Sequence, residues 1–345
     1  MSRLNKSASG GSEEQILAIG GQAVIEGVMM RSPERLATAV RRASGQIELK
    51  IQEYRSLFQR HRWLNIPVIR GAITLFEVMI LGIKHLNFSA DVAMRDAEAQ
   101  EQASNPGKKR AKKKKEAGLS TFSAVVSVSI ALVVGLALFF AFPLFAATHL
   151  FSIEREALAF NLVAGTIRIA LFLGYLMLIS LMKDIRRLFQ YHGAEHKTIF
   201  AFEKGLELTV ANVRRQPRLH PRCGTSFLVM VMLVSLLFFA LVDTAVMAAT
   251  GKISLLIRLS THLPLVPIVA GLSYEAIKAS ARRPDHPLVR IFIAPGLALQ
   301  RITTSEPDDS MIEVAIVALK AARGEDVSAW LKKEAPPVTE AAAAS

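Results

Sequence analysis

The sequence contains little cysteine and few aromatic residues, and both shortages limit what the chain can be. Its 345 residues include a single cysteine, Cys223, so no intramolecular disulfide can form, which fits the reducing side of a membrane. Only 7% of the residues are aromatic although 51% are hydrophobic, an apolar excess greater than in most soluble domains. Neither a nucleotide-binding glycine loop nor a serine-elbow motif occurs, so an ATP-driven pump or a serine hydrolase has little support.

Four long apolar blocks hold most of the hydrophobic residues. Each is long enough to cross about 30 Å of hydrocarbon at about 1.5 Å of helical rise per residue. The second block has Arg168 as its one charge and the third has only Asp243, while the fourth is weaker, with an expected core at 263–277 and prolines that favour a kink. The blocks lie at 122–147, 157–182, 226–249 and 253–279, and they predict a multi-pass α-helical membrane protein with about four transmembrane helices in residues 122–279.

Lysine and arginine are distributed unevenly around these blocks, and this predicts an orientation. A run from Lys108 to Lys115 precedes the first block, and the loop 183–225 between the second and third blocks is also basic. Because positive residues stay on the cytoplasmic side, we predict that this loop and both termini are cytoplasmic, in a bacterial inner membrane. The lysine run lacks interleaved aromatics, so we expect it to contact anionic lipid headgroups and expect no specific nucleic acid. The first residues are polar, so no cleavable signal peptide is expected.

The rest of the chain divides into shorter segments. Residues 15–65 contain strand-like runs with turn residues at 41–46, which predicts a β-rich cytoplasmic module of three or four strands. Residues 66–90 are expected to form an amphipathic or interfacial helix. Residues 280–333 are predicted to be a helical cytoplasmic segment that, like the N-terminal module, could dock a partner protein or take part in a homo-oligomer. The remaining predictions are a Lys-rich linker at 91–121 and disordered ends at 1–14 and 334–345.

One segment of the basic loop carries the residues of a metal site. His192 and His196 are four residues apart, so on a helix they lie on one face and can reach one ion. Glu195 lies beside them as a potential general base, and the order His-x-x-Glu-His is that of the inverted zincin motif. The alternative is an interfacial helix whose histidines form local hydrogen bonds without an ion.

A second candidate half-site lies further along the same loop. His220 and Cys223 have the spacing of a pair of metal ligands, and imidazole and thiolate both suit zinc. Together with His192 and His196 they would give a four-ligand site, or three ligands and a water, for a divalent metal such as zinc. In the alternative, Cys223 is a small buried residue at the start of the third block and His220 lies at headgroup level.

Several charged residues elsewhere are further site candidates. Glu275 lies near the inner end of the fourth block, where an acid is a candidate for a ligand or a base. Glu26 lies among apolar residues and would have to be protonated, paired with Arg31 or Arg70, bound to a cation, or turned to water. Arg222 suits an anionic substrate group, although the positive-inside bias explains it equally well.

The motifs of the chain together resemble the YqhQ family of bacterial integral membrane proteins, over roughly residues 16–325. The family has no known function, and its members are described as predicted metal-dependent enzymes, so the resemblance implies a multi-pass membrane protein. The Lys-rich linker departs from the family pattern. The motifs that carry the resemblance are GGQAVIEGVMMR at 20–31, HGAEHKT at 192–198, LHPRCGTSF at 219–227, AGLSYE at 270–275 and PGLALQRITTSEPDDSMIEVAI at 295–316.

Three classes of function follow. An open zinc site at the cytoplasmic membrane face would support hydrolysis of a peptide, phosphoester or lipid-linked substrate, with Glu195 or Glu275 moving the proton. A closed site, or no metal at all, would instead indicate a scaffold or accessory factor without catalytic activity. A small-solute transporter would use Arg168 and Asp243 as a pathway pair, but two such charges more simply pair with each other.

Overall fold

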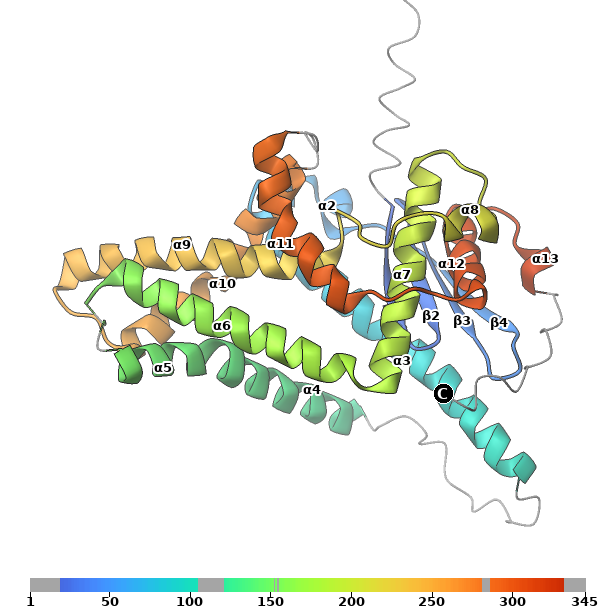
Figure 1. Ribbon diagram of the computed structural model, residues 1–345, viewed down its shortest axis with the longest axis horizontal. Helices are drawn as coiled ribbons and strands as arrows, with labels where there is room; N and C mark the ends of the chain where they lie inside the picture. The colour runs from blue at the N-terminus through green and yellow to red at the C-terminus, as the bar shows by residue number, and fades with distance from the viewer. Residues whose placement is uncertain (1–18, 105–120, 152, 154, 281–285, 332–345) are drawn as a thin grey trace, which may run out of the picture.

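The protein consists of a bundle of long helices joined to a small domain built around a β-sheet (Figure 1). The structure is a computed structural model that describes residues 19–104, 121–151, 153, 155–280 and 286–331. It confirms the predicted architecture of four long apolar helices with an N-terminal antiparallel sheet. The predictions for residues 1–14, the run from Lys108 to Lys115 and residues 334–345 lie outside the described residues.

The N-terminal sheet has four antiparallel strands in the order β1-β2-β3-β4. The turn between β3 and β4 closes at the predicted place, where Gly45 adopts a positive φ of 83° and its N–H donates to the Arg42 carbonyl. One face of the sheet packs on helices α7 and α12, and the other face packs on α3. The strands are β1 Gly20–Val24, β2 Gly27–Arg31, β3 Arg35–Arg41 and β4 Ile47–Glu53.

The bundle contains four helices that are long and apolar enough to cross a membrane. The first combines α4, a π-helical turn and α5, and the fourth continues through Pro264 and Pro267 as one helix that begins before the predicted core at 263–277. Much of the surface of these helices is exposed apolar side chain, as expected of spans that face lipid. Their bounds are α4 Thr121–Leu136, η2 Ala137–Ala141, α5 Phe142–Phe151, α6 Ala157–Ser180, α9 Gly224–Thr250 and α10 Leu255–Ser280.

Helix α3, Ile69–Ser104, corrects one predicted boundary. We expected a helix over 66–90 and a linker from residue 91, but the helix continues for 36 residues without a break. Contacts with the sheet explain the extension, because Asp96 accepts hydrogen bonds from Arg42 and Val92 lies in the apolar layer between α3 and the sheet. Polar composition alone therefore misplaced the end of this helix.

The remaining helices connect the bundle with the sheet. Helix α12 begins after Asp308, whose carboxylate accepts the N–H of Met311 as a cap, and it is almost entirely buried against β2 and β3. This matches the helix predicted at the C-terminal end. The other bounds are α2 Leu57–Arg60, η1 Arg62–Leu64, α7 Lys183–Glu203, α8 Val210–Arg214, α11 Pro287–Thr303, α12 Asp309–Ala322 and α13 Ser328–Leu331.

Candidate metal centre

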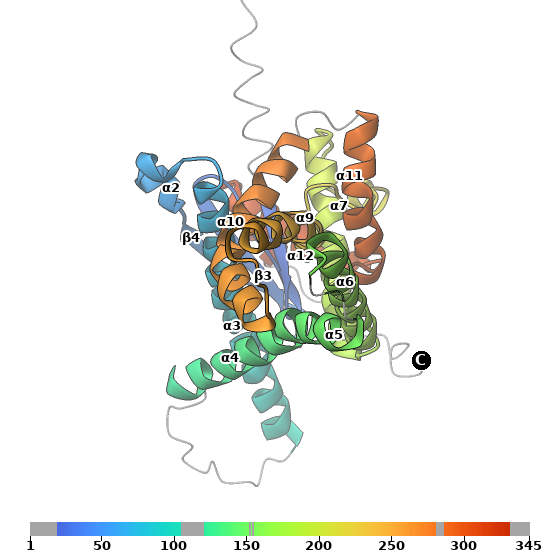
Figure 2. The same cartoon turned by 90° about the vertical axis from the view of Figure 1, so that its left-hand side faces the viewer.

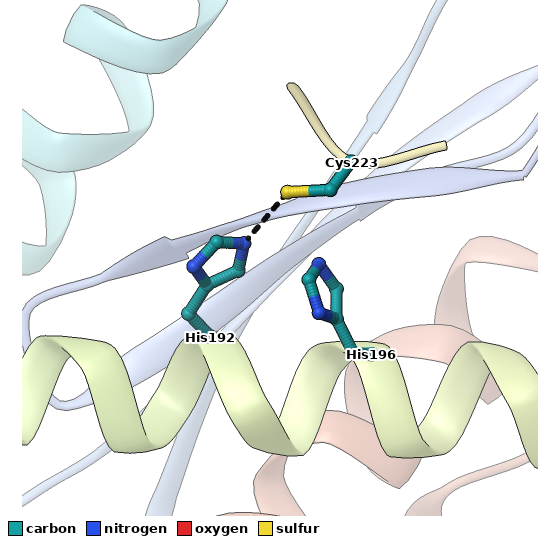
Figure 3. Close-up of side chains that lie close together, drawn as sticks. All are labelled: His192, His196 and Cys223. Carbon is teal, nitrogen blue, oxygen red and sulfur yellow. Dashed lines mark hydrogen bonds between the residues drawn. The ribbon is translucent and has the colours of Figure 1, made fainter. Parts of the chain in front are cut away.

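Helix α7 brings His192 and His196 together with Cys223, which is the N-cap of α9 (Figure 3). The two imidazole rings lie 4.3 Å apart, one helical turn from each other on the same face. One potential ligand atom from each of the three residues lies within 4.8 Å of the others. Helix α7 thus supplies the two imidazoles, and the loop before α9 adds the thiol.

Backbone carbonyls fix the orientation of both rings. His192 Nδ1 lies 2.8 Å from the Thr303 carbonyl oxygen, and His196 Nδ1 lies 2.5 Å from the Arg218 carbonyl oxygen. Because a carbonyl oxygen only accepts hydrogen bonds, each neutral ring carries its proton on Nδ1 and presents the Nε2 lone pair. This arrangement, with the second ring nitrogen bonded to a carbonyl, is typical of metal-ligating histidines.

The unpaired atoms of the group fit a metal ion. His192 Nε2 lies 3.2 Å from Cys223 Sγ, while His196 Nε2 is buried and has no hydrogen-bond partner in the described part of the chain. A buried nitrogen lone pair without a partner costs about 1–3 kcal/mol, and a bound cation would remove that cost. Two neutral imidazoles and a thiolate form a donor set suited to zinc. His192, His196 and Cys223 could therefore hold a metal ion.

The protonation states of two donors also favour metal binding. Burial lowers the pKa of His196, which keeps the ring neutral. Burial opposes ionisation of Cys223, but its contacts with His196 and Thr225 outweigh that effect and lower the pKa of the thiol. A metal ligand must be a thiolate or a neutral imidazole, and both shifts act in that direction.

Glu195 lies on the same turn of α7 and is only 4% exposed. Burial raises the pKa of its carboxyl group to about 8, although the nearby His192 and a hydrogen bond from the Gly21 backbone oppose the shift. The Oε2 atom has no hydrogen-bond partner among the described residues. A Cβ at Gly21 would lie 3.0 Å from the Glu195 carboxyl carbon, so this glycine allows strand β1 to approach the acid.

A short backbone segment after α11, residues 303–307, crosses over α7 beside the histidines. The Ser305 N–H donates to the Phe189 carbonyl, and the Lys197 ammonium group lies 2.7 Å from the Glu306 carboxylate. A Cβ at Gly193 would lie 2.1 Å from the Ser305 carbonyl oxygen, so only glycine permits this crossing. We call residues 303–307 the strap, because it holds the Thr303 carbonyl against His192.

His220 lies beside the group but does not join it. Its ring is 5.6 Å from that of His196, and its Nε2 lies 3.2 Å from Glu203 instead of facing the other donors. Its Nδ1 accepts a hydrogen bond from the Arg222 backbone, and the Arg222 guanidinium also pairs with Glu203. The contact with Glu203 therefore keeps the ring of His220, the predicted further ligand, outside the donor group.

Glu275 and Glu26, the other candidate acids, have ion-pair partners of their own. Glu275 binds Arg70 through two hydrogen bonds of 2.5 Å and does not belong to the converging donor group. Glu26 lies in the turn between β1 and β2 with a positive φ of 53° and pairs with Arg187, not with Arg31 or Arg70. Arg31 instead lies over the ring of Tyr54.

The two intramembrane charges do not pair with each other, contrary to expectation. Asp243 accepts hydrogen bonds from Asn161 Nδ2 at 2.6 Å and Arg258 Nε at 2.9 Å, and it lies 2.8 Å from His262 Nε2. Arg168 instead donates to the Phe139 carbonyl. The acid is thus satisfied by a network across α6, α9 and α10, which leaves the predicted pathway pair without structural support.

Sequence reasoning missed four residues that shape the centre. The Gly21 motif was noted, but its role in approaching Glu195 was not, and Glu203 carried no signal beyond its position in the basic loop. The carbonyls of Thr303 and Arg218 cannot be inferred from residue type, because every residue has one. Long-range backbone contacts from Thr303, Arg218 and Gly21 therefore orient His192, His196 and Glu195, while the side chain of Glu203 holds His220.

Comparison with known proteins agrees with the resemblance drawn from the motifs. Residues 66–325 match a family described as "Protein of unknown function (DUF1385)". The chain is also 35% identical over 310 residues to "Uncharacterized protein YqhQ" of Bacillus subtilis (strain 168), which covers 87% of this chain and 90% of that protein. No solved structure matches the chain significantly. The matched family region contains every donor of the candidate metal centre.

Proposed function

Since the chain belongs to the DUF1385 family, whose function is not established, we propose its function from the site itself. We propose a metal-dependent hydrolase in which His192, His196 and Cys223 hold a divalent metal, zinc by the chemistry of the donors. The observation that carries the proposal is the convergence of two carbonyl-oriented imidazoles on one thiol, with the buried Nε2 of His196 lacking a partner.

Among the described residues three donors converge, so a tetrahedral ion would keep one position for water. When bound, zinc supplies Lewis acidity and a water of lowered pKa. Glu195 is the general base in this proposal, because its carboxylate lies on the same turn of α7 and Oε2 is uncommitted. Burial holds the pKa of that carboxyl group at about 8, within reach of neutral pH.

The substrate class follows from the surroundings of the centre. Arg218 and Arg222 flank the centre in the segment that leads to Cys223, and the Arg218 backbone orients His196. These cations pair with Glu306 and Glu203, and exchange of those partners for an anionic group, such as a phosphoester or a lipid-linked anion, would favour such a substrate over a neutral peptide.

We further propose that this centre lies at the cytoplasmic face of a bacterial inner membrane, with both termini in the cytoplasm. The charge distribution supports this orientation, because the connections 152–156 and 251–254 are short while the segment from α7 to α9 is rich in lysine and arginine. The lysine run at 108–115 would then contact anionic headgroups.

Metal content of the detergent-purified protein tests the centre. The parent protein, purified without chelator and supplied with zinc, should contain about one zinc per chain, and His192→Ala, His196→Ala and Cys223→Ala should each lose most of it. His61→Ala is the matched control, because His61 is exposed and lies outside the donor group. A parent protein without bound metal, or His61→Ala losing as much as His196→Ala, would overturn the proposal.

The second candidate function is a scaffold with a structural metal, and the burial of the centre favours it. His196 and Cys223 are less than 9% exposed, which leaves little room for a substrate. Replacing zinc by Co²⁺ separates the two functions, since its visible spectrum reports the coordination. A spectrum that changes when imidazole or azide is added indicates an open position, whereas an unchanged spectrum indicates a closed site. Glu195→Gln should retain the metal if Glu195 is a base and lose it if Glu195 is a ligand.

A further inference from the structure

The structure points to a membrane-immersed segment beyond the four spans. We propose that residues 57–83 form a re-entrant hairpin whose α2 and η1, with the exposed Arg60 and His61, lie at headgroup level, and whose residues 66–83 enter the cytoplasmic leaflet. Its occupant is the acyl-chain region of the bilayer, which covers the exposed apolar side of this hairpin. This inference does not depend on the metal centre.

The exposed surface of α3 changes character abruptly along its length. In residues 66–83, every residue classed as exposed is apolar, whereas from Lys84 onward the exposed positions include Asn87, Asp91 and Arg95. At about 1.5 Å per residue, the 15 helical residues of this stretch, 69–83, cover roughly 22 Å. The apolar exposed residues are Ile66, Pro67, Ile69, Phe76, Met79, Ile80 and Ile83. A water-facing helix would not keep so long a stretch free of exposed polar residues.

The two charged side chains within this stretch are both engaged by the protein. Arg70 makes its two-pronged pair with Glu275 of α10, and Glu77 Oε1 accepts the N–H of Leu57 at 3.0 Å. A charge at membrane depth is expected to have such a partner. The sequence indicated Glu275 as a catalytic candidate. Its position at membrane depth explains instead why it pairs with Arg70.

Irregular backbone within a membrane must have its hydrogen-bonding groups satisfied by the protein. At the exposed tip of the hairpin, the carbonyls of Ile66 and Pro67 accept the N–H groups of Arg70 and Ile69. Val68 adopts a positive φ of 70°, and its carbonyl oxygen would lie 2.2 Å from a Cβ at Gly271 of α10. The Val68 N–H bonds to the Glu275 carboxylate, so this donor just before α3 is satisfied by the protein.

The contact with α10 sets the depth of the tip. Gly271 is nine residues before the end of α10 at Ser280, which corresponds to about 13 Å along a helix of 26 residues. Figure 2, viewed along the bundle, places α3 beside α10, and the two helices are in contact. The tip therefore lies below the headgroups if α10 spans the bilayer with Ser280 at the cytoplasmic side.

Lipid is a better occupant than a second protein chain. The exposed side chains of this stretch continue the lipid-facing surface of α10, where Leu263 and Ile268 are also exposed. Trp63 is 72% exposed next to the exposed Arg60, the combination of aromatic and cationic residues that is typical of a membrane interface. A protein partner would leave no reason for the exposed surface to become polar at Lys84.

Fluorescence quenching by lipids brominated on their acyl chains tests this placement. The chain has two tryptophans, Trp63 and Trp330, so replacing both by Phe gives a silent background. Ile80→Trp in that background, reconstituted as the full chain into vesicles, should lose most of its fluorescence in brominated lipid. Met94→Trp is the matched control, because Met94 is exposed on the polar half of the same helix and should retain its fluorescence.

The possible outcomes separate lipid from the other occupants. Equal quenching at positions 80 and 94, or none at position 80, overturns the proposal. A second copy of the chain as occupant would give an unquenched Ile80→Trp together with a dimer by light scattering in detergent. Trp63 in the Trp330→Phe protein provides a reading that needs no new tryptophan, and it too should be quenched, whereas Trp330 in the Trp63→Phe protein should not.

Discussion

Gly193 is the residue at which the candidate metal centre has least room for change. A methyl group there would meet the Ser305 carbonyl oxygen at 2.1 Å and push away the strap that orients His192. We expect Gly193→Ala to destabilise the protein by roughly 1–3 kcal/mol, as overpacking does, and to lower its metal content. Thermal unfolding in detergent and metal analysis of the purified variant measure both effects.

Gly174→Ala provides the control for this substitution. Gly174 also lies within a helix, α6, but a Cβ there would meet nothing within 4 Å. Alanine is the better helix former by about 0.8–1 kcal/mol, so this variant should be at least as stable as the parent. If both variants unfold alike, the strap is not held by the close contact at Gly193.

Asp243 is the residue on which the polar network of the bundle depends. Its carboxylate accepts hydrogen bonds from Arg258 and Asn161 in a fully buried position. Removing one charge of a buried pair typically costs about 3–5 kcal/mol, because the other charge stays in a medium of low polarity. We therefore expect Asp243→Asn to lower the unfolding temperature in detergent markedly.

The double variant Asp243→Asn with Arg258→Gln distinguishes charge pairing from packing. It removes both charges and should recover part of the lost stability, since the penalty of the single variant comes from an unbalanced guanidinium. An additive loss of stability would show instead that the two side chains act independently. Asn161→Ala, which removes only one hydrogen bond to Asp243, should cost less than either charge.

The donors of the metal centre could be predicted in part from the sequence. His192, Glu195 and His196 share one helix, so their spacing alone placed them together. Cys223 was a weaker prediction, and the structure places the ring of His220 against Glu203, outside the donor group. Residues in different elements meet through tertiary packing, which the spacing within a single chain segment does not encode.

At the scale of elements, the first half of helix α3 has an exposed apolar surface and the second half packs on the sheet. His85 lies where the one half gives way to the other. His85 is fully buried against the sheet, where its Nδ1 lies 2.7 Å from the Thr38 hydroxyl. Burial lowers its pKa to about 4, and the nearby Lys50 and Lys84 add to the shift. The folded state therefore keeps this ring neutral under conditions in which an unfolded chain would protonate it.

Protonation of His85 in the unfolded state makes the stability of the protein fall as the pH falls. Well above pH 6.5, the ordinary pKa of histidine, His85 is neutral in both the folded and the unfolded state and the full stability is present. As the pH falls toward 4 the unfolded state gains a proton first, so His85 costs about 2 kcal/mol of stability by pH 5. Unfolding in detergent between pH 7 and pH 5 should therefore show a steeper loss for the parent than for His85→Gln. Equal slopes would show that His85 does not carry this dependence.

Local patterns predicted most elements but not their lengths. The four apolar helices follow from composition, and the turn at 41–46 follows from its turn-forming residues. Residues 91–104 are polar in sequence, yet they remain helical because Asp96 and Arg95 reach partners on the sheet. An element held by distant ion pairs cannot be recognised from its own periodicity.

At the scale of the whole molecule, the candidate metal centre joins three parts of the protein. Its histidines belong to α7, its thiol caps the third membrane helix, and the neighbouring Glu195 accepts a bond from strand β1. The bundle and the sheet domain therefore meet at this point, as Figure 1 shows for α7 and the start of α9. A ligand bound here would hold the segment before Cys223 in place as well as any substrate.

Metal removal should loosen that segment first. A ligand present at about 100 times its Kd stabilises the folded protein by about 2.7 kcal/mol, and its removal loses that stability. Arg218 lies in this segment, and its carbonyl loses its anchor when His196 moves. Trypsin should therefore cut after Arg218 faster in chelator-treated protein, on the order of 100-fold where cleavage follows the open population. Mass spectrometry of early digests measures this rate.

His196→Ala should already be cut rapidly, with no further increase on chelation, because it lacks both the donor and the anchor. A chelator effect of equal size in the parent and in His196→Ala would mean that the released metal came from another site.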